Sequence, residues 1–236
     1  MLQGVNKRYL RWLLWIKNQM SKPLFSIVVL ISGHGSNLQA IIDQSQEENA
    51  LIQVNAVVSN VKGAYGLERT KKAGIPSHII EHQNFQHREC FDLALIEKID
   101  PYHPELIVLA GFMRRLGSSF VRHYQGRLIN IHPALLPKYP GLNTHRRVLQ
   151  NREQRHGCSI HFVTNQVDGG PVIAYTSLTV KSYHTADTLK QSVQKLEHKL
   201  YPKVLTWFAD RRVSLHGDRV FLDSQFVSLD GVEIAF

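Results

Sequence analysis

The sequence predicts an α/β fold: a mostly parallel central sheet with helices on both faces, and an antiparallel part toward the C-terminus. Three observations lead to this prediction. Continuous apolar, β-rich runs at 26–31 and 105–110 have the pattern of strands buried on both faces. Helical patterns alternate with strand patterns along the chain, which favours a parallel sheet. Two later strand-like runs, 159–164 and 172–177, are joined by a glycine-containing loop.

Residues 1–24 differ in composition from the rest, because basic residues occur there without acidic ones, among leucines and tryptophans. The apolar run is too short to span a bilayer, and no small-residue cleavage site follows it. A basic amphipathic helix for a membrane surface or a partner is one interpretation. We favour an N-terminal extension outside the fold, followed by a single domain over 25–236.

The first strand, 26–31, leads into a glycine turn and then into a helix that has begun by Leu38. Unpaired backbone N–H groups and the positive end of the helix dipole make such a turn an anion site. Gly35, Ser36 and Asn37 are placed to hold a phosphate. The turn is neither a Walker loop nor a full dinucleotide fingerprint. The alternative is that Ser36 or Asn37 only caps the helix.

Further elements continue the alternation of strands and helices. We expect strands at 52–58, 77–80 and 105–110, and helices at 66–73 and about 85–99. The segment 111–116 then leaves the sheet at its carboxyl edge, where open α/β sheets bind their ligands. It should line a crevice, in which Arg114 could meet a carboxylate. Arg88 could do the same, although a solvated surface arginine is the alternative.

The central stretch, 126–141, begins as a strand and ends in a proline-rich segment that can neither pair in a sheet nor continue a helix. The strand should therefore stop at His132. Asn130 and His132 point the same way because side chains alternate along a strand. An amide can donate to developing negative charge, and an imidazole exchanges protons near neutral pH. A polar strand end beside a loop is the alternative.

The loop between 159–164 and 172–177 carries Asp168. If it folds over the crevice, Asp168 can orient His132 and stabilise its charged form. The alternative is a turn aspartate that bonds its own backbone. His161 could lie near the site, but we assign it no role. A long helix is expected at about 186–208, and a small hairpin at 220–227.

The formal charge of +9 favours anionic partners without choosing among them. Two cysteines are too few for a disulfide framework, and a reducing cytoplasm fits best. The thirteen histidines show no zinc-site spacing, so we expect no metal.

Four motifs occur in order along the chain: ISGHGSNL (31–38), LAGFMR (109–114), NIHPALLPKYPG (130–141) and DGGPV (168–172). Together they closely resemble the phosphoribosylglycinamide formyltransferases, folate-dependent enzymes of purine biosynthesis, over 25 to about 212. One departure is Ala134, where this family commonly has serine. The resemblance implies a Rossmann-like formyltransferase fold. It also implies formyl transfer from 10-formyltetrahydrofolate to the amine of glycinamide ribonucleotide.

Position by position, the resemblance makes Asn130, His132 and Asp168 the catalytic trio. It assigns the substrate phosphate to Gly35, Ser36 and Asn37, and the ribose side to Gln194 and Glu197. The folate site takes Asn130 together with Arg88, Met113, Arg114, Arg115, Leu116, Thr164, Asn165, Gln166, Val167 and Asp168. Asn130 and protonated His132 would then stabilise the tetrahedral oxygen, and Asp168 would sustain the imidazolium, without a metal or a covalent intermediate.

Three alternatives use part of the same pattern. A formyltetrahydrofolate deformylase is expected to carry a regulatory domain before the first strand, and a methionyl-tRNA formyltransferase a barrel domain after the catalytic one. A basic nucleotide- or nucleic-acid-binding module is the non-enzymatic alternative, and its binding should weaken steeply with salt. We expect a cytoplasmic monomer or homodimer that binds small molecules and has neither a nucleic-acid partner nor a stable membrane association.

Overall fold

The computed structural model describes residues 23–236, so the expectation for the N-terminal extension lies almost entirely outside the described residues. The main sheet has eight strands in the order β11-β7-β6-β5-β4-β1-β2-β3. In chain order these strands are β1 (Phe25–Ile31), β2 (Ile52–Ser59), β3 (Ser77–Ile79), β4 (Leu106–Leu109), β5 (Leu128–His132), β6 (Arg155–Phe162), β7 (Val172–Thr179) and β11 (Val232–Glu233).

Neighbouring strands are parallel from β3 to β5, antiparallel between β5 and β6 and between β6 and β7, and parallel again between β7 and β11. The predicted α/β fold with a mostly parallel sheet is therefore confirmed. The helices are α2 (Ser36–Ser45), α3 (Gly66–Lys72), α4 (Arg88–Ile99), α5 (Ser118–His123), α6 (Thr144–Gln150) and α7 (Ala186–Ala209).

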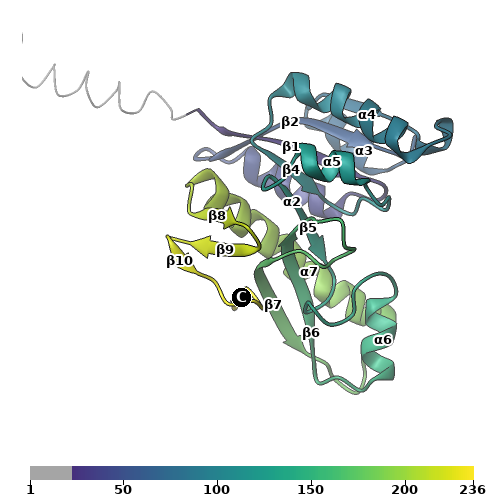
Figure 1. Ribbon diagram of the computed structural model, residues 1–236. Helices are drawn as coiled ribbons and strands as arrows, with labels where there is room; N and C mark the ends of the chain where they lie inside the picture. The colour runs from purple at the N-terminus through teal and green to yellow at the C-terminus, as the bar shows by residue number, and fades with distance from the viewer. Residues whose placement is uncertain (1–22) are drawn as a thin grey trace, which may run out of the picture.

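Two hydrophobic clusters explain why the central strands are apolar throughout. Ile27, Val29 and Ile31 of β1 pack with α2 and α7 on one face of the sheet. Val28 and Leu30 pack with α4 and α5 on the other. Because alternate side chains are buried on opposite faces, both faces need apolar residues. Figure 1 shows α4 and α5 beside the N-terminal strands, and α7 running along the later ones.

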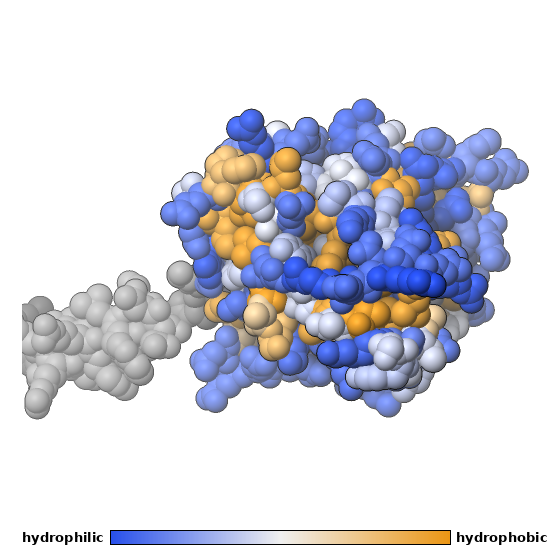
Figure 2. All heavy atoms as spheres, turned by 90° about the horizontal axis from the view of Figure 1, so that it is seen from below, coloured by the Kyte–Doolittle hydropathy of each residue, from blue (hydrophilic) through white to orange (hydrophobic). Residues whose placement is uncertain are grey.

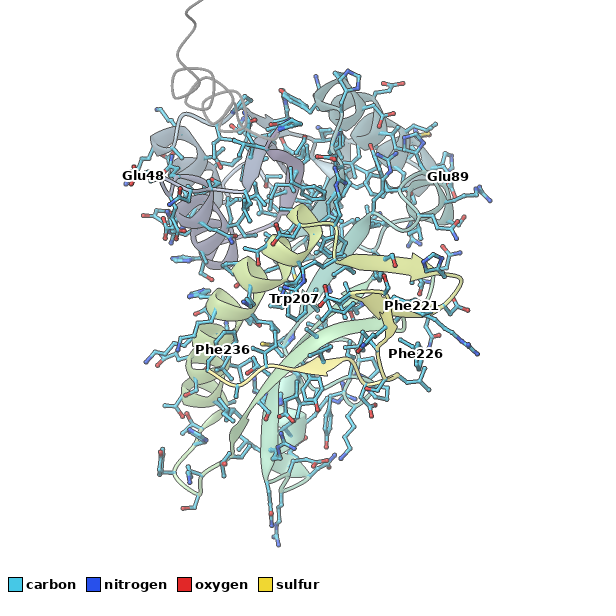
Figure 3. All side chains as sticks on the ribbon, turned by 90° about the vertical axis from the view of Figure 1, so that its left-hand side faces the viewer. Glu48, Glu89, Trp207, Phe221, Phe226 and Phe236 are labelled. Carbon is cyan, nitrogen blue, oxygen red and sulfur yellow. The ribbon has the colours of Figure 1, made fainter. Side chains whose placement is uncertain are left out.

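The C-terminal part forms a separate antiparallel sheet of β8 (Val213–His216), β9 (Arg219–Leu222) and β10 (Gln225–Phe226). The hairpin predicted at 220–227 corresponds to β9 and β10. Val220 and Val227 join the same core cluster as Trp207 of α7. Figure 3 shows this sheet beside α7, with Phe221 and Phe226 on its strands. The small sheet thus covers the end of α7.

Several predicted boundaries differ from the structure. The helix expected from about 85 begins at Arg88, because Phe85 is extended and packs against the second core cluster. The strand expected at 159–164 begins four residues earlier, at Arg155, and ends at Phe162, because it pairs along the whole of β7. The helices α5 and α6, of six and seven residues, were not predicted, since they are too short to show a clear periodicity.

Among the described residues, no helix is both long and apolar enough to cross a membrane. On the face seen in Figure 2, apolar surface occurs in separate patches among polar side chains.

A substitution at Gly157 of β6 tests how closely β6 and β7 pack. A Cβ at this position would lie 1.9 Å from the Thr176 carbonyl oxygen and 2.9 Å from the Ser177 Cα, both backbone atoms. We expect Gly157→Ala to lower the free energy of unfolding by about 2–4 kcal/mol. The measurement is the urea midpoint and slope. Gly63→Ala is the control, because nothing lies within 4 Å of its added Cβ. Equal midpoints for the two variants would contradict this packing.

Candidate active site

A cleft of about 510 Å³ opens at the carboxyl edge of β4 and β5. One wall is the segment 111–116, another is the loop that follows β6, and a third is the start of α6 with Lys190 of α7. The predicted site residues in its lining are Met113, Arg114, Arg115, Leu116, Asn130, His132, Thr164, Asn165, Gln166, Val167 and Asp168. The structure therefore brings together residues that lie up to 55 positions apart, from Met113 to Asp168.

Asn130 and His132 both line the cleft, as the alternation along the strand predicted. They belong to β5, which has the parallel strand β4 on one side and the antiparallel strand β6 on the other. The strand ends at His132, directly before Pro133. His132 is only 5% exposed, so its ring meets solvent only through the cleft.

The contacts of His132 fix the position of its proton. Its Nε2 lies 2.8 Å from the Tyr139 carbonyl oxygen, and its Nδ1 lies 3.3 Å from Oδ2 of Asp168. A carbonyl can only accept, so Nε2 carries the hydrogen. In the neutral ring, Nδ1 is then the free base on the Asp168 side. In the charged ring, the same nitrogen donates.

The charges of this pair are set by opposing effects. Burial lowers the pKa of His132, while the Tyr139 carbonyl and Asp168 act to raise it. Burial alone would raise the pKa of Asp168, but the His161 ring 3.6 Å away, the hydrogen bond from the Gly141 N–H and the nearby His132 hold it below its usual value. Asp168 is therefore ionised. It faces an imidazole whose protonation burial opposes and the Tyr139 carbonyl and Asp168 favour.

The Asp168 carboxylate is held over the cleft by contacts outside its own loop. The Gly141 N–H donates to its Oδ2 at 2.8 Å. The backbone of Asp168 has a φ of 48°, a left-handed conformation that aspartate tolerates better than most residues. The contacts of this carboxylate with Gly141 and the histidines differ from those of a turn aspartate that bonds only its own backbone.

His161 is a part of the site to which the sequence assigned no role. Its Nδ1 donates to the Phe162 carbonyl at 2.8 Å, and its Nε2 lies 3.2 Å from Nδ2 of Asn130 and 3.6 Å from Oδ1 of Asp168. The ring thereby orients the Asn130 amide. The signal that identifies it is the strand pairing, because Asn130 and His161 are register partners. That pairing cannot be read from either strand alone.

A second unpredicted pair lies at the edge of the cleft. His145, the second residue of α6, lines the cleft, and its Nδ1 is 2.9 Å from Nε2 of His156. The pKa of each ring is lowered to about 4, mainly by burial. Lys190 and His132 add to the lowering for His145, and His145 and His132 add to it for His156. Both rings are therefore neutral near pH 7 and add no positive charge to the wall.

The predicted phosphate turn lies beside the cleft but outside its lining. Gly35 has a φ of 70°, and a Cβ there would lie 2.7 Å from the Gly66 Cα, so glycine is required. Gln194 Nε2 donates to Ser36 Oγ at 2.7 Å, and Asn37 Nδ2 donates to Glu197 Oε2 at 2.9 Å. No side chain caps α2 by a hydrogen bond, contrary to the capping alternative. These two hydrogen bonds bring Gln194 and Glu197 of α7 next to the turn, as the predicted binding site for the ribonucleotide requires.

Arg88 is the predicted folate-site residue whose position differs most from the prediction. It is exposed at the start of α4 and does not line the cleft. Its Cδ lies beside Gly117, where it would be 3.4 Å from an added Cβ. The Gly117 N–H donates to Asp92 at 2.8 Å, and burial raises the pKa of Asp92 while Arg88 and Arg114 act against the rise. Arg88 is therefore placed at the outer end of the segment 111–116.

Within residues 23–236, no group of three or more histidine, cysteine or acidic side chains is arranged to hold a metal ion. The polar side chains that line the cleft include Asn130, His132 and Asp168, together with the basic side chains of Arg114, Arg115 and Lys190.

Comparisons with known proteins point to one family. A family model described as formyl transferase matches residues 25–205. Phosphoribosylglycinamide formyltransferase of Escherichia coli (strain K12) is 52% identical over 200 residues, 85% of this chain and 94% of that protein. The trifunctional purine biosynthetic protein adenosine-3 of Bos taurus is 41% identical over 189 residues, 80% of this chain and 19% of that protein.

A solved structure of phosphoribosylglycinamide formyltransferase from Coxiella burnetii aligns with a TM-score of 0.87 and 52% identity, over 91% of this chain and 100% of that one. A glycinamide ribonucleotide transformylase from Symbiobacterium toebii aligns with a TM-score of 0.82 and 38% identity, over 84% of this chain and 94% of that one. All of the residues that line the cleft fall within the segment matched by the family model.

Proposed function

The chain belongs to the formyl transferase family, and from this membership we infer that it is an enzyme of purine biosynthesis that formylates the amine of glycinamide ribonucleotide. One observation carries the assignment of the chemistry to the cleft. His132 is held in one tautomer between the Tyr139 carbonyl and Asp168, beside an amide donor on the same strand. This arrangement suits a reaction in which an amine loses a proton while an oxygen gains negative charge.

The formyl donor is 10-formyltetrahydrofolate, bound in the cleft. Its pterin lies against the loop 164–168, whose backbone offers hydrogen bonds to ring nitrogens and amide groups. Its benzoyl-glutamate portion extends along 111–116 toward Arg114 and Arg115, which supply positive charge for carboxylates. Arg88, at the outer end of the same segment, meets the carboxylate that projects farthest from the cleft.

The acceptor binds with its phosphate at Gly35, Ser36 and Asn37, where backbone N–H groups begin α2. Gln194 and Glu197, already bonded to Ser36 and Asn37, take its ribose hydroxyls. Lys190 lies one helical turn before Gln194 and lines the cleft, so α7 runs from the phosphate turn to the catalytic residues. The amine is thereby directed at the formyl carbon.

The reaction follows from these positions. The amine nitrogen bonds to the formyl carbon, and the carbonyl electron pair moves to oxygen, which accepts a hydrogen bond from the Asn130 amide. The amine proton passes to Nδ1 of His132, and the imidazolium, stabilised by Asp168, donates a hydrogen bond to the same oxygen. When the oxygen electron pair returns to re-form the carbonyl, the bond to the folate nitrogen breaks. That nitrogen takes up the proton held by the imidazolium, relayed by Asp168 and water, which leaves tetrahydrofolate, the formylated amide and a neutral His132.

The test offers purified protein 10-formyltetrahydrofolate with glycinamide ribonucleotide, with water as the only acceptor, or with charged initiator methionyl-tRNA, and follows release of tetrahydrofolate. We expect release that requires the ribonucleotide. Release without an acceptor would identify a deformylase, and release that requires the tRNA would identify a methionyl-tRNA formyltransferase. Either of these outcomes would overturn the proposed function.

Arg115 tests the placement of the folate tail. Its Nη2 donates to the Asn165 carbonyl at 3.1 Å and so joins the two walls of the cleft. We expect Arg115→Leu to raise KM for the donor about 3- to 10-fold, because one exposed charged contact contributes about 1 kcal/mol, and to leave kcat within about twofold. The measurement is steady-state kinetics against the donor at saturating ribonucleotide.

The control for Arg115 is Arg122→Leu, on α5, because Arg122 is exposed and does not line the cleft. Its loss should leave KM unchanged. An unchanged KM in Arg115→Leu as well would place the tail of the donor elsewhere.

A further inference from the structure

Tyr139 contacts the catalytic machinery from a position outside the cleft. Its carbonyl accepts the hydrogen bond from Nε2 of His132 at 2.8 Å. Its side chain does not line the catalytic cleft but a second hollow behind it, together with Asn151 and Glu153. Tyr139 therefore lies outside the lining of the cleft, and its contact with the catalytic residues is the hydrogen bond to His132.

The hydroxyl of Tyr139 lies at the centre of a network of polar side chains. It donates to Glu153 Oε1 at 2.9 Å and accepts from Asn151 Nδ2 at 2.9 Å. Glu153 is also paired with Lys138, at 3.1 Å. The guanidinium of Arg147 lies 5.2 Å from the centre of the tyrosine ring. The side chain is thus fixed by the end of α6 and the segment that follows it.

The backbone of Tyr139 needs such support. Its φ is 59°, a left-handed conformation that is uncommon for a bulky residue. Residues held in this region persist only when their surroundings determine the conformation. Because the carbonyl belongs to the same residue, the contacts of the ring and hydroxyl also fix the direction in which the carbonyl points.

We propose that Tyr139 is a positioning residue for the catalytic histidine: its hydroxyl, held by Glu153 and Asn151, fixes the carbonyl that keeps His132 in the Nε2–H tautomer. The catalytic consequence rests on the proposed function, whereas the tautomer is a property of the folded chain itself. Without the anchor, the carbonyl is free to turn from the ring, and the two neutral tautomers of His132 become closer in energy.

The effect on protonation has a definite sign. The Tyr139 hydrogen bond acts to raise the pKa of His132, against the lowering by burial. Weakening it lowers that pKa further, so the acidic limb of kcat/KM, which reports protonation of the free base, moves to lower pH. The other charged or titratable groups that face His132 stay in place; they are Asp168, His161, Arg147, His145 and His156.

The experiment uses Tyr139→Phe, which keeps the ring and removes both hydrogen bonds of the hydroxyl. In protein with ¹⁵N-labelled histidine, the parent should show His132 as the Nε2–H tautomer, and the variant a mixture with a lower titration midpoint. Turnover should fall about 3- to 10-fold, the usual effect of one hydrogen bond, with KM for the ribonucleotide within twofold. The acidic limb should shift downward, which a general loss of structure does not produce.

Tyr175→Phe is the matched control. Tyr175 lines the same second hollow, and its hydroxyl also donates to a carboxylate, Glu233, at 3.3 Å, but it does not contact His132. This variant should keep the parent tautomer and pH profile. Glu153→Gln retains an acceptor for Tyr139 and should stay near the parent, while Glu153→Ala should resemble Tyr139→Phe.

A folded Tyr139→Phe protein with the parent tautomer and titration of His132 would overturn the proposal. If Tyr139→Phe does not fold, Glu153→Ala decides in the same way, because it removes the anchor and leaves the tyrosine. If the parent transfers no formyl group but the tautomer shifts as expected, the proposed function fails and the positioning role of Tyr139 stands.

Discussion

Asp168→Asn should lower kcat by about 10²- to 10⁴-fold, the range for loss of a group in acid–base catalysis. The carboxylate lies 3.3 Å from Nδ1 of His132, and its pKa is held low by His161 and the Gly141 N–H, although burial opposes this. Asparagine keeps the shape but supplies no negative charge to stabilise the imidazolium. It also cannot relay a proton to the departing nitrogen.

The measurement is single-turnover formyl transfer at saturating substrates, with folate binding followed separately. Binding should persist, since most of the cleft is unchanged. Asp187→Asn is the control, because Asp187 is an exposed residue in the first turn of α7. Near-normal turnover in Asp168→Asn would remove this carboxylate from the mechanism.

His132→Ala has the second large effect, also about 10²- to 10⁴-fold in kcat. It removes the base at Nδ1 and the donor to the developing oxyanion together. Because His132 and Asp168 act as a unit, the double variant should lose little more than the worse of the two single variants. If the fold loss of kcat in the double variant equals the product of the losses in the two single variants, the two side chains act independently.

The control for His132→Ala is His123→Ala, since His123 is an exposed histidine at the end of α5 and does not line the cleft. Both proteins should unfold at similar urea concentrations if the large effect on turnover is chemical. A common loss of stability and activity would instead indicate a structural effect.

The centre of the sheet could be predicted from the sequence because β1 and β4 are buried on both faces and therefore read as apolar runs. The common direction of the Asn130 and His132 side chains could be predicted because alternate residues of a strand point to the same face. Asp168 required the assumption that its loop folds back over β5, which the contacts with Gly141 and His132 bear out geometrically. For the central strands and for Asn130 and His132, a local pattern therefore determines the structure, whereas the place of Asp168 depends on a tertiary contact.

Other parts of the site depend on pairings that no local pattern contains. His161 is brought to Asn130 by the register of β5 and β6. The bonds from α7 to the phosphate turn join Asn37 to Glu197, 160 positions along the chain. Only the resemblance to a known family suggested the roles of Gln194 and Glu197, because their spacing alone fits an ordinary solvent-exposed helix face. The short helices α5 and α6 had no periodic signal.

The bonds between α7 and the phosphate turn also bear on how the protein folds. Closing a connection of this length is slow in comparison with forming a hairpin or a helix, because the chain must lose the entropy of a large loop. The site is complete only when the first helix of the described chain and the last long one have met. Catalytic activity regained after dilution from denaturant therefore reports completion of the whole fold, whereas recovered helix content does not.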